Sequence, residues 1–245
     1  MKTVNSTELQ NNFGKYLTLA AQEDIIITRN GNAVAKLTAV KENAETQGKA
    51  GLVRESAEKY NHSVRKATYE EFLELTKGSE ERYEFIDGEI YLLSSPKTAH
   101  QIVLAELFGI FYIWFQGKDC MPLPAPYDIE LRRTPEEINI VQPDLMVICD
   151  LHEHLDENDY YKGVPILLVE IVSASTRSKD LIKKLDLYMS CGVKEYWIVN
   201  PINKEVTVYL FEDKEIHSSR TFKENETAHS FTFAGLAVEL ERIFK

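Results

Sequence analysis

The sequence lacks the features of disulfide-rich, zinc-stabilised and membrane-spanning proteins. Its three cysteines, Cys120, Cys149 and Cys191, are scattered and odd in number, and no two form a CxxC pair. We therefore expect reduced thiols in a cytoplasmic protein, with neither a disulfide framework nor a structural zinc site. The longest apolar run, residues 102–115, contains Glu106 and is too short to cross a bilayer. It predicts a buried core helix, and neither a signal peptide nor a membrane partner is expected.

The sequence also lacks a basic excess, since 39 acidic residues outnumber 28 basic ones and the net charge is −11. The acidity is uneven, because residues 67–245 hold 32 acidic and 18 basic side chains. Residues 1–40 hold three acidic and four basic ones, and residues 41–66 hold four and six. An acidic surface disfavours nucleic acid, because the phosphate backbone binds to basic side chains. The charge separates an acidic C-terminal part from a near-neutral N-terminal part.

Composition divides the chain into two folded units and a linker. In residues 1–40 a helical pattern is followed by IIIT, the turn RNGN and AVAKLTAV, which together predict a β-hairpin. Residues 41–66 are polar with almost no large apolar side chains, which is typical of a linker. Residues 67–245 form the second unit, and neither unit contains an internal repeat.

The second unit has the pattern of a mixed α/β fold. Thr68 and Glu71 fit a capping box before a short helix, and Asp87–Gly88 predicts the turn of a hairpin. Further helices are expected over residues 99–115, 178–191 (ended by Gly192) and 234–244, with strands in YDIEL, VQPDLMVICD, ILLVEIV, EYWIVN and EVTVYLF. This order predicts a mixed-sheet sandwich rather than a regular βαβ repeat.

Two carboxylates in apolar strands carry the strongest chemical signal. Asp144 follows Pro143, and Glu170 lies inside the otherwise apolar run of residues 166–172. A strand this apolar is normally buried on both faces, where an ionised carboxylate costs several kcal/mol unless it is paired or binds a metal. Neighbouring acids of this kind suit Mg²⁺ or Mn²⁺, which can activate water against a phosphodiester. The alternative is that Asp144 faces solvent and Glu170 pairs with a buried Lys or Arg.

One lysine and three histidines are further candidates. Lys184 shares a helix side with apolar neighbours, whereas Lys183 projects about 100° away. Lys184 therefore either extends along the core edge to solvent or reaches into a site. His100 opens the long helix and either supports the site or caps that helix. His152 and His154 flank Glu153 without enough further ligands for zinc, which favours a solvated loop.

The second unit resembles a nuclease family in QPDLMVI, VEIVSAST, KKLDLY and GVKEYWIVNP, over roughly residues 68–245. These motifs are similar to those of the Uma-two family, within the PD-(D/E)XK restriction-endonuclease-like superfamily. The resemblance implies a magnesium-dependent endonuclease with Asp144 and Glu170 as metal ligands. It also implies catalytic roles for Lys184 and for Glu84 in YEFIDGE. The superfamily motif has its lysine two positions after the acid, where this chain has Val172, so the lysine is displaced to Lys184.

The first unit resembles the Phd/YefM antitoxin family in KTVNSTEL and ITRNGNAVAKL. The resemblance implies a βααββ module that forms a homodimer, binds operator DNA and neutralises a toxin protein. Phosphate contacts would come from Lys2, Lys15 and Arg29. Gln10 stands where the family often has a basic residue, and it can still hydrogen-bond phosphate or adenine. The alternative is a module that serves only for dimerisation.

The leading hypothesis is a fusion of an antitoxin-like DNA-binding dimer with a metal-dependent DNA nuclease. The alternative is a non-enzymatic antitoxin or autorepressor whose C-terminal domain binds a partner, which the charge of that domain favours. A third interpretation is a structural dimer or scaffold that binds neither metal nor DNA.

Overall fold

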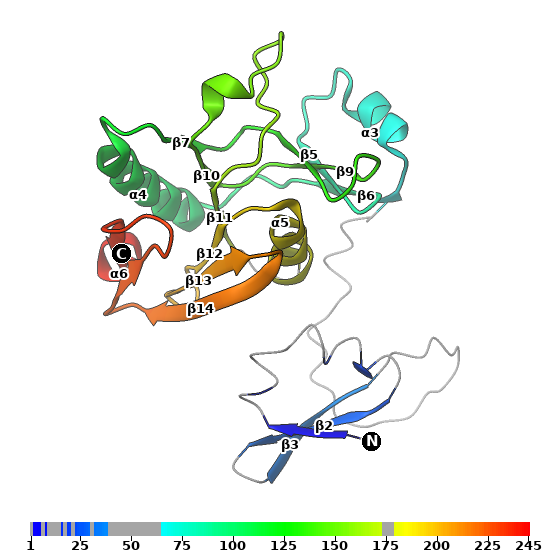
Figure 1. Cartoon of the computed structure of the whole chain (residues 1–245), viewed down its shortest axis with the longest axis vertical. Coiled ribbons are helices and arrows are strands. Elements are labelled where there is room, and N and C mark those ends of the chain that lie inside the picture. Colours follow the sequence, from blue (N-terminus) through cyan, green and yellow to red (C-terminus); the bar gives the residue numbers. More distant parts are fainter. Residues whose placement is uncertain are drawn as a thin grey trace. The chain divides into compact units, whose positions relative to one another are not determined.

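A computed structural model describes residues 2–5, 8, 16, 19–20, 23–29, 32–38, 65–172 and 179–245 (Figure 1). The chain divides into two compact units, residues 1–55 and 56–245. Most of the expected linker, residues 41–66, lies outside the described residues. Its last two residues form the short strand β4 (Arg65–Lys66), which pairs with β6 of the second unit.

The first unit contains a small mixed sheet. Its strands are β1 (Lys2–Asn5), β2 (Ile25–Arg29) and β3 (Asn32–Leu37). Strand β2 lies in the middle, parallel to β1 and antiparallel to β3. The predicted hairpin over IIIT and AVAKL is therefore confirmed. Four buried side chains from the strands and from the segment between β1 and β2 form its core: Val4, Tyr16, Ala20 and Ile25.

The second unit begins with the helix and hairpin that the sequence predicts. Helix α3 (Tyr69–Thr76) starts with the complete capping box, in which Thr68 and Glu71 each accept a hydrogen bond from the other's backbone N–H. Strands β5 (Tyr83–Ile86) and β6 (Glu89–Leu92) follow. Asp87 and Gly88 turn the chain with φ values of 54° and 72°, the left-handed conformation that a two-residue hairpin loop needs.

The described strands of this unit form two main sheets. The larger has the order β14-β13-β12-β11-β10-β7, and the other has the order β4-β6-β5-β9-β8. Strands β11 and β12 are parallel, whereas the remaining neighbours in the larger sheet are antiparallel. The new strands are β7 (Met121–Pro124), β8 (Ile129–Arg132), β9 (Ile138–Val141), β10 (Leu145–Ile148), β11 (Leu167–Ile171), β12 (Glu195–Asn200), β13 (Glu205–Glu212) and β14 (Glu215–Lys223).

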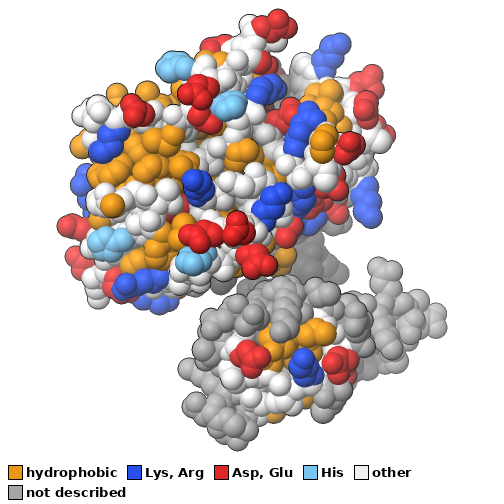
Figure 2. All heavy atoms as spheres, viewed as in Figure 1, with side chains coloured by type: hydrophobic (Ala, Val, Ile, Leu, Met, Phe, Trp, Pro, Cys, Tyr) orange, Lys and Arg blue, Asp and Glu red, His pale blue; other side chains and the backbone are white. Residues whose placement is uncertain are grey.

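Helices cover both faces of the larger sheet. Figure 1 shows α4 (Thr98–Phe115) and α5 (Leu185–Cys191) on opposite sides of β10–β12. Alternate strand residues face two cores, one with α4 and α6 (Leu240–Ile243), the other with α5 and the smaller sheet. Helix α4 has the length and apolarity of a membrane span, but it also packs five buried side chains into the first core. Figure 2 shows hydrophobic side chains gathered at the surface over the region of α4. Ile113 of this helix is an exposed large hydrophobic residue.

Three expectations about this unit were wrong. The run VQPDLMVICD is not one strand, because the chain leaves the smaller sheet after Val141 and enters the larger one at Leu145. The final helix is expected over residues 234–244, but Ala237–Glu239 forms β16 instead, paired with β15 (Thr227–His229). Only Leu240–Ile243 is helical. In both places long-range strand pairing overrides the local pattern.

The third error concerns the cysteines, because Cys120 and Cys149 form a disulfide. Met121 pairs with Ile148 across β7 and β10, so the two cysteines lie directly opposite each other, one residue beyond that pair. Their separation of 29 residues in sequence gives no sign of this contact. Cys191 remains a free, partly buried thiol.

Glu195 at the start of β12 is a buried carboxylate with a structural role. It is fully buried and accepts hydrogen bonds from Trp197 Nε1 (2.6 Å), Ser230 Oγ (3.0 Å) and the Thr232 backbone N–H (2.6 Å). These bonds attach the segment after β15 to the larger sheet.

We expect Glu195→Ala to lower the free energy of unfolding by about 2–3 kcal/mol, because it leaves several buried donors without an acceptor. Urea unfolding followed by circular dichroism measures the change. The exposed Glu215 on β14 provides the control variant Glu215→Ala, with an expected change below about 0.5 kcal/mol. Equal stability of the two variants would contradict the structural role of Glu195.

Candidate active site

The two acids from the apolar strands are cross-strand neighbours. Leu145 of β10 pairs with Val169 of β11, so extending this antiparallel register by one residue sets Asp144 opposite Glu170. Residues directly opposite each other project to the same face, with Cβ atoms roughly 4.5–5.5 Å apart. The backbone N–H of Ile171 donates to Asp144 Oδ2 at 2.7 Å. Non-local pairing thus brings together acids that are 26 residues apart in sequence.

A buried lysine bridges Glu170 and a second glutamate. Lys184 ends the π-helical segment η3 (Lys179–Lys184), immediately before α5. Its Nζ lies 2.6 Å from Glu170 Oε1 and 2.7 Å from Glu84 Oε1. Tyr188, one turn further along, donates to Glu170 Oε1 at 2.6 Å. Lys184 therefore reaches inward, and the buried lysine expected as the alternative partner of Glu170 is this same residue.

Glu84 brings the smaller sheet into the site. It lies on β5, is fully buried, and accepts a hydrogen bond from the backbone N–H of Gln142 at 3.0 Å. Gln142 begins the three-residue crossing between the two sheets, and that crossing ends at Asp144. Lys184 and Gln142 thus hold Glu84 beside the chain segment that carries the first acid.

His100 contacts the exposed edge of the site. It lies in the first turn of α4, and its Nε2 is 3.1 Å from Asp144 Oδ2. The side chains of His100 and Asp144 are 15% and 19% exposed, in contrast to the buried Glu84, Glu170 and Lys184. His100 was expected either to support the site or to cap the long helix. Its contact with the Asp144 carboxylate favours the first role.

Asp128, just before β8, is a neighbour of the site that sequence reasoning missed. Ile129 pairs with Val141, so the same register sets Asp128 opposite Gln142. Burial of the carboxyl group raises the pKa of Asp128, and the charge of Glu84 adds to this, although a hydrogen bond from Gln142 opposes it. In the sequence, Asp128 is one of two acids in YDIEL, and nothing local distinguishes it. Its place beside Gln142 follows only from the register of β8 and β9.

The two carboxylates, Asp144 and Glu170, suit a magnesium-type ion better than zinc. Magnesium typically uses one or two carboxylates and completes its shell with water and substrate phosphate. Both hydrogen bonds that described residues make to the Asp144 carboxylate fall on Oδ2, which leaves Oδ1 for an ion or a water molecule. Among the described residues no three His, Cys, Asp or Glu side chains form a metal-binding group. His154 Nε2 lies 3.3 Å from Asp150 Oδ2.

Val172, two residues after Glu170, is buried and packs into the core with α5. Lys184 approaches Glu170 from the α5 side of that core. The ammonium group that contacts Glu170 therefore comes from the helical segment and not from this strand.

The predicted DNA-binding residues of the first unit are only partly visible. Lys2 is exposed on β1. Arg29 ends β2, but its side chain lies outside the described part of the structure, as do Gln10 and Lys15.

Comparison with known proteins agrees with both resemblances. Residues 69–241 match the model of the Uma2 family, described as "Putative restriction endonuclease". The chain belongs to the Uma2 family. Residues 1–59 match the model "Antitoxin Phd_YefM, type II toxin-antitoxin system".

Two similar proteins extend the comparison. The chain is 27% identical over 145 residues to "Uncharacterized protein slr1290" from Synechocystis sp., covering 59% of this chain and 74% of the relative. A crystal structure titled as "a putative nuclease belonging to DUF820" from Anabaena variabilis has a TM-score of 0.58 at 18% identity. That match covers 71% of this chain and 96% of the other. The mixed α/β unit therefore has the predicted restriction-endonuclease-like fold, and this Uma2 protein carries a nuclease-type domain.

We expect Lys184→Met to lower the free energy of unfolding by about 3–5 kcal/mol, because Glu84 and Glu170 would lose their shared buried cation. Denaturant unfolding at neutral pH measures this change. Lys223, which is 65% exposed and paired with Glu205, gives the matched control Lys223→Met with an expected loss below about 1 kcal/mol. Similar losses in the two variants would argue against the buried ionic cluster.

Proposed function

We propose that the C-terminal unit is a nuclease that hydrolyses DNA phosphodiester bonds with Mg²⁺ or Mn²⁺. The observation that carries this proposal is the meeting of Asp144 and Glu170 across β10 and β11 with the buried ammonium group of Lys184. Membership of the Uma2 family supports the same reaction class.

Each residue has a separate task in this proposal. Asp144 and Glu170 hold the metal, and the hydrogen bonds from Ile171 N–H and His100 fix the orientation of Asp144. The bound metal would lower the pKa of a water molecule and neutralise charge on the phosphate. Lys184 stabilises the negative charge that develops on the scissile phosphate, and Glu84 keeps its ammonium group in position.

DNA is the proposed substrate because of the first unit rather than the surface of the second. Residues 67–245 carry more acidic than basic side chains, and Figure 2 shows both signs interspersed on one face. Such a surface contributes little general attraction for phosphate. The Phd/YefM-like unit would supply DNA affinity and raise the local concentration of DNA at the active site.

We expect the full-length protein to nick or linearise plasmid DNA with Mg²⁺ or Mn²⁺ and to be inactive with EDTA. Asp144→Asn and Glu170→Gln should each lower the cleavage rate by at least about 100-fold, because each removes a charged ligand from the metal. Gel assays at several metal concentrations measure these rates.

The control for this assay is Asp213→Asn, in the exposed turn between β13 and β14. This turn residue has a positive φ that asparagine also tolerates, so wild-type cleavage is expected. If Asp144→Asn cleaves DNA as fast as wild type, the nuclease proposal fails.

A second function, DNA binding by a homodimer of the first unit, is supported by the match of residues 1–59 to the antitoxin family. The exposed Lys2 on β1, together with Gln10, Lys15 and Arg29, would contact phosphates. A toxin protein would be the further partner of such a module. The non-enzymatic repressor is the special case in which only this function operates.

We expect the full-length Asp144→Asn protein to shift DNA from its own promoter, with an affinity that falls as salt rises. Adding Lys2→Ala should reduce the slope of log K against log salt by about one per protomer, because one phosphate contact is lost. The control is Lys36→Ala on β3, whose lysine already pairs with Asp24 at 2.5 Å. An equal slope in all three proteins would remove Lys2 from the interface.

A further inference from the structure

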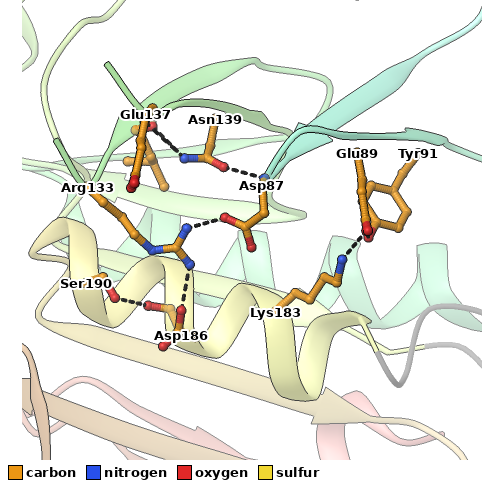
Figure 3. Close-up of polar contacts among 10 residues, drawn as sticks. Asp87, Glu89, Tyr91, Arg133, Glu137, Asn139, Lys183, Asp186 and Ser190 are labelled. Carbon is orange, nitrogen blue, oxygen red and sulfur yellow. Dashed lines mark hydrogen bonds and ion pairs between the residues drawn. The ribbon is translucent and has the colours of Figure 1, made fainter. Parts of the chain in front are cut away.

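A second set of charged contacts lies outside the Glu84–Glu170–Lys184 cluster and joins the β5–β6 hairpin to the helix that carries the lysine (Figure 3). The hairpin supplies Glu84 on β5, and its turn begins at Asp87. The helical segment supplies Lys184 at the end of η3, and its next residues form α5. Any shift of the hairpin relative to this helix would change the distance between Glu84 and Lys184.

Arg133 bridges the two elements with both of its terminal nitrogens. It follows β8, and its Nη1 donates to Asp87 Oδ1 at the tip of the hairpin. Its Nη2 donates to Asp186 Oδ2 on α5 at 2.6 Å. Figure 3 shows the guanidinium group between the two carboxylates. Asp186 is two residues after Lys184, so this contact fixes the start of α5.

The tip of the hairpin is also held through its backbone. The N–H of Asp87 donates to the buried Asn139 Oδ1 at 2.9 Å, and the Asn139 amide donates to the carbonyl of Glu137 at 3.2 Å. Asn139 and Arg133 both belong to the β8–β9 part of the smaller sheet. Asp87 is therefore held both through its backbone N–H and through its carboxylate.

Lys183 makes a parallel contact on the next strand of the hairpin. Its Nζ donates to Glu89 on β6 and lies 5.3 Å from the centre of the Tyr91 ring. Tyr91 also donates to Glu89 Oε2 at 2.5 Å. Burial alone would lower the pKa of Lys183, but Glu89 and Tyr91 outweigh it and raise the pKa. Lys183, Lys184 and Asp186 thus all connect the helix to the hairpin or its anchor.

We infer that Arg133 is a positioning residue that holds the Lys184 ammonium group between Glu84 and Glu170 through its bridge from Asp87 to Asp186. The kinetic part of this inference rests on the proposed nuclease function, whereas the placement of Lys184 does not.

The position of Arg133 distinguishes this bridge from an ion pair within one element. The Arg133 side chain is only 20% exposed, although Asp87 and Asp186 are 38% and 61% exposed, and it connects two elements that carry different members of the buried cluster. The neighbouring Arg132 is 44% exposed and pairs with Glu130 on its own strand. An arginine fork can join two carboxylates at once, which a neutral glutamine cannot replace. Arg132→Gln is therefore a matched control for Arg133→Gln.

The first test measures the accessibility of Lys184 without using activity. Folded wild-type protein is labelled with an amine-acylating reagent, and peptide mass spectrometry with fragmentation separates Lys183 from Lys184. Lys184 is 2% exposed, so wild-type labelling should be slow. Arg133→Gln should speed Lys184 labelling by about tenfold, which corresponds to roughly 1.4 kcal/mol, and Arg132→Gln should leave it unchanged. Equal labelling in both variants overturns the inference.

The second test asks whether Arg133 acts through Lys184. Arg133→Gln should lower kcat for DNA cleavage by roughly 10- to 100-fold with little change in KM, because a small misplacement of a catalytic group has a cost of this order. In a Lys184→Met background the same change should have almost no further effect on residual cleavage. An additive effect in the double variant overturns the inference.

Two further comparisons keep the outcomes distinct. If circular dichroism shows that Arg133→Gln does not fold, Asp186→Asn provides a second variant, which weakens only the contact between Arg133 and α5. Asp186→Asn should also speed the labelling of Lys184. Unchanged labelling of Lys184 in this variant would overturn the inference. If wild type cleaves no DNA while Lys184 labelling still depends on Arg133, the positioning role stands and the proposed nuclease function fails.

Discussion

The contact between the Lys184 ammonium group and the carboxylates of Glu84 and Glu170 is the constraint on which the site depends. Burying three charged groups costs several kcal/mol per ion unless their geometry and hydrogen bonds compensate. Here Tyr188 and the backbone N–H of Gln142 supply further donors to the two acids. Because Glu84 and Glu170 belong to different sheets, this cluster also joins the two sheets of the C-terminal unit.

The crossing between the sheets explains why Asp144 lies at the edge of this cluster. Strand β9 ends at Val141, and β10 begins at Leu145. Between them, the backbone N–H of Gln142 donates a hydrogen bond to Glu84. Asp144 is therefore placed by the same segment that completes the hydrogen bonding of Glu84. The result is a buried ionic cluster beside a partly exposed acid that His100 contacts.

The sequence predicts those parts of the structure that depend on local chemistry. The capping box at Thr68 and the turn at Asp87–Gly88 are confirmed, because their signals lie within a few residues. The isolated charge of Glu170 also predicted either a metal or a buried cation beside it, and Lys184 was a candidate for the site, but only the structure brings the two residues together. The Cys120–Cys149 disulfide and the position of Asp128 depend on strand register, which a single sequence does not encode locally.

The most direct test of the proposed metal site is a crystal structure of the full-length protein grown with Mn²⁺, with data collected at the manganese absorption edge. An anomalous peak bound by Asp144 and Glu170, and absent in the Asp144→Asn variant, is the predicted result. A wild-type crystal with no manganese at these two carboxylates, or with manganese bound only elsewhere, would contradict it.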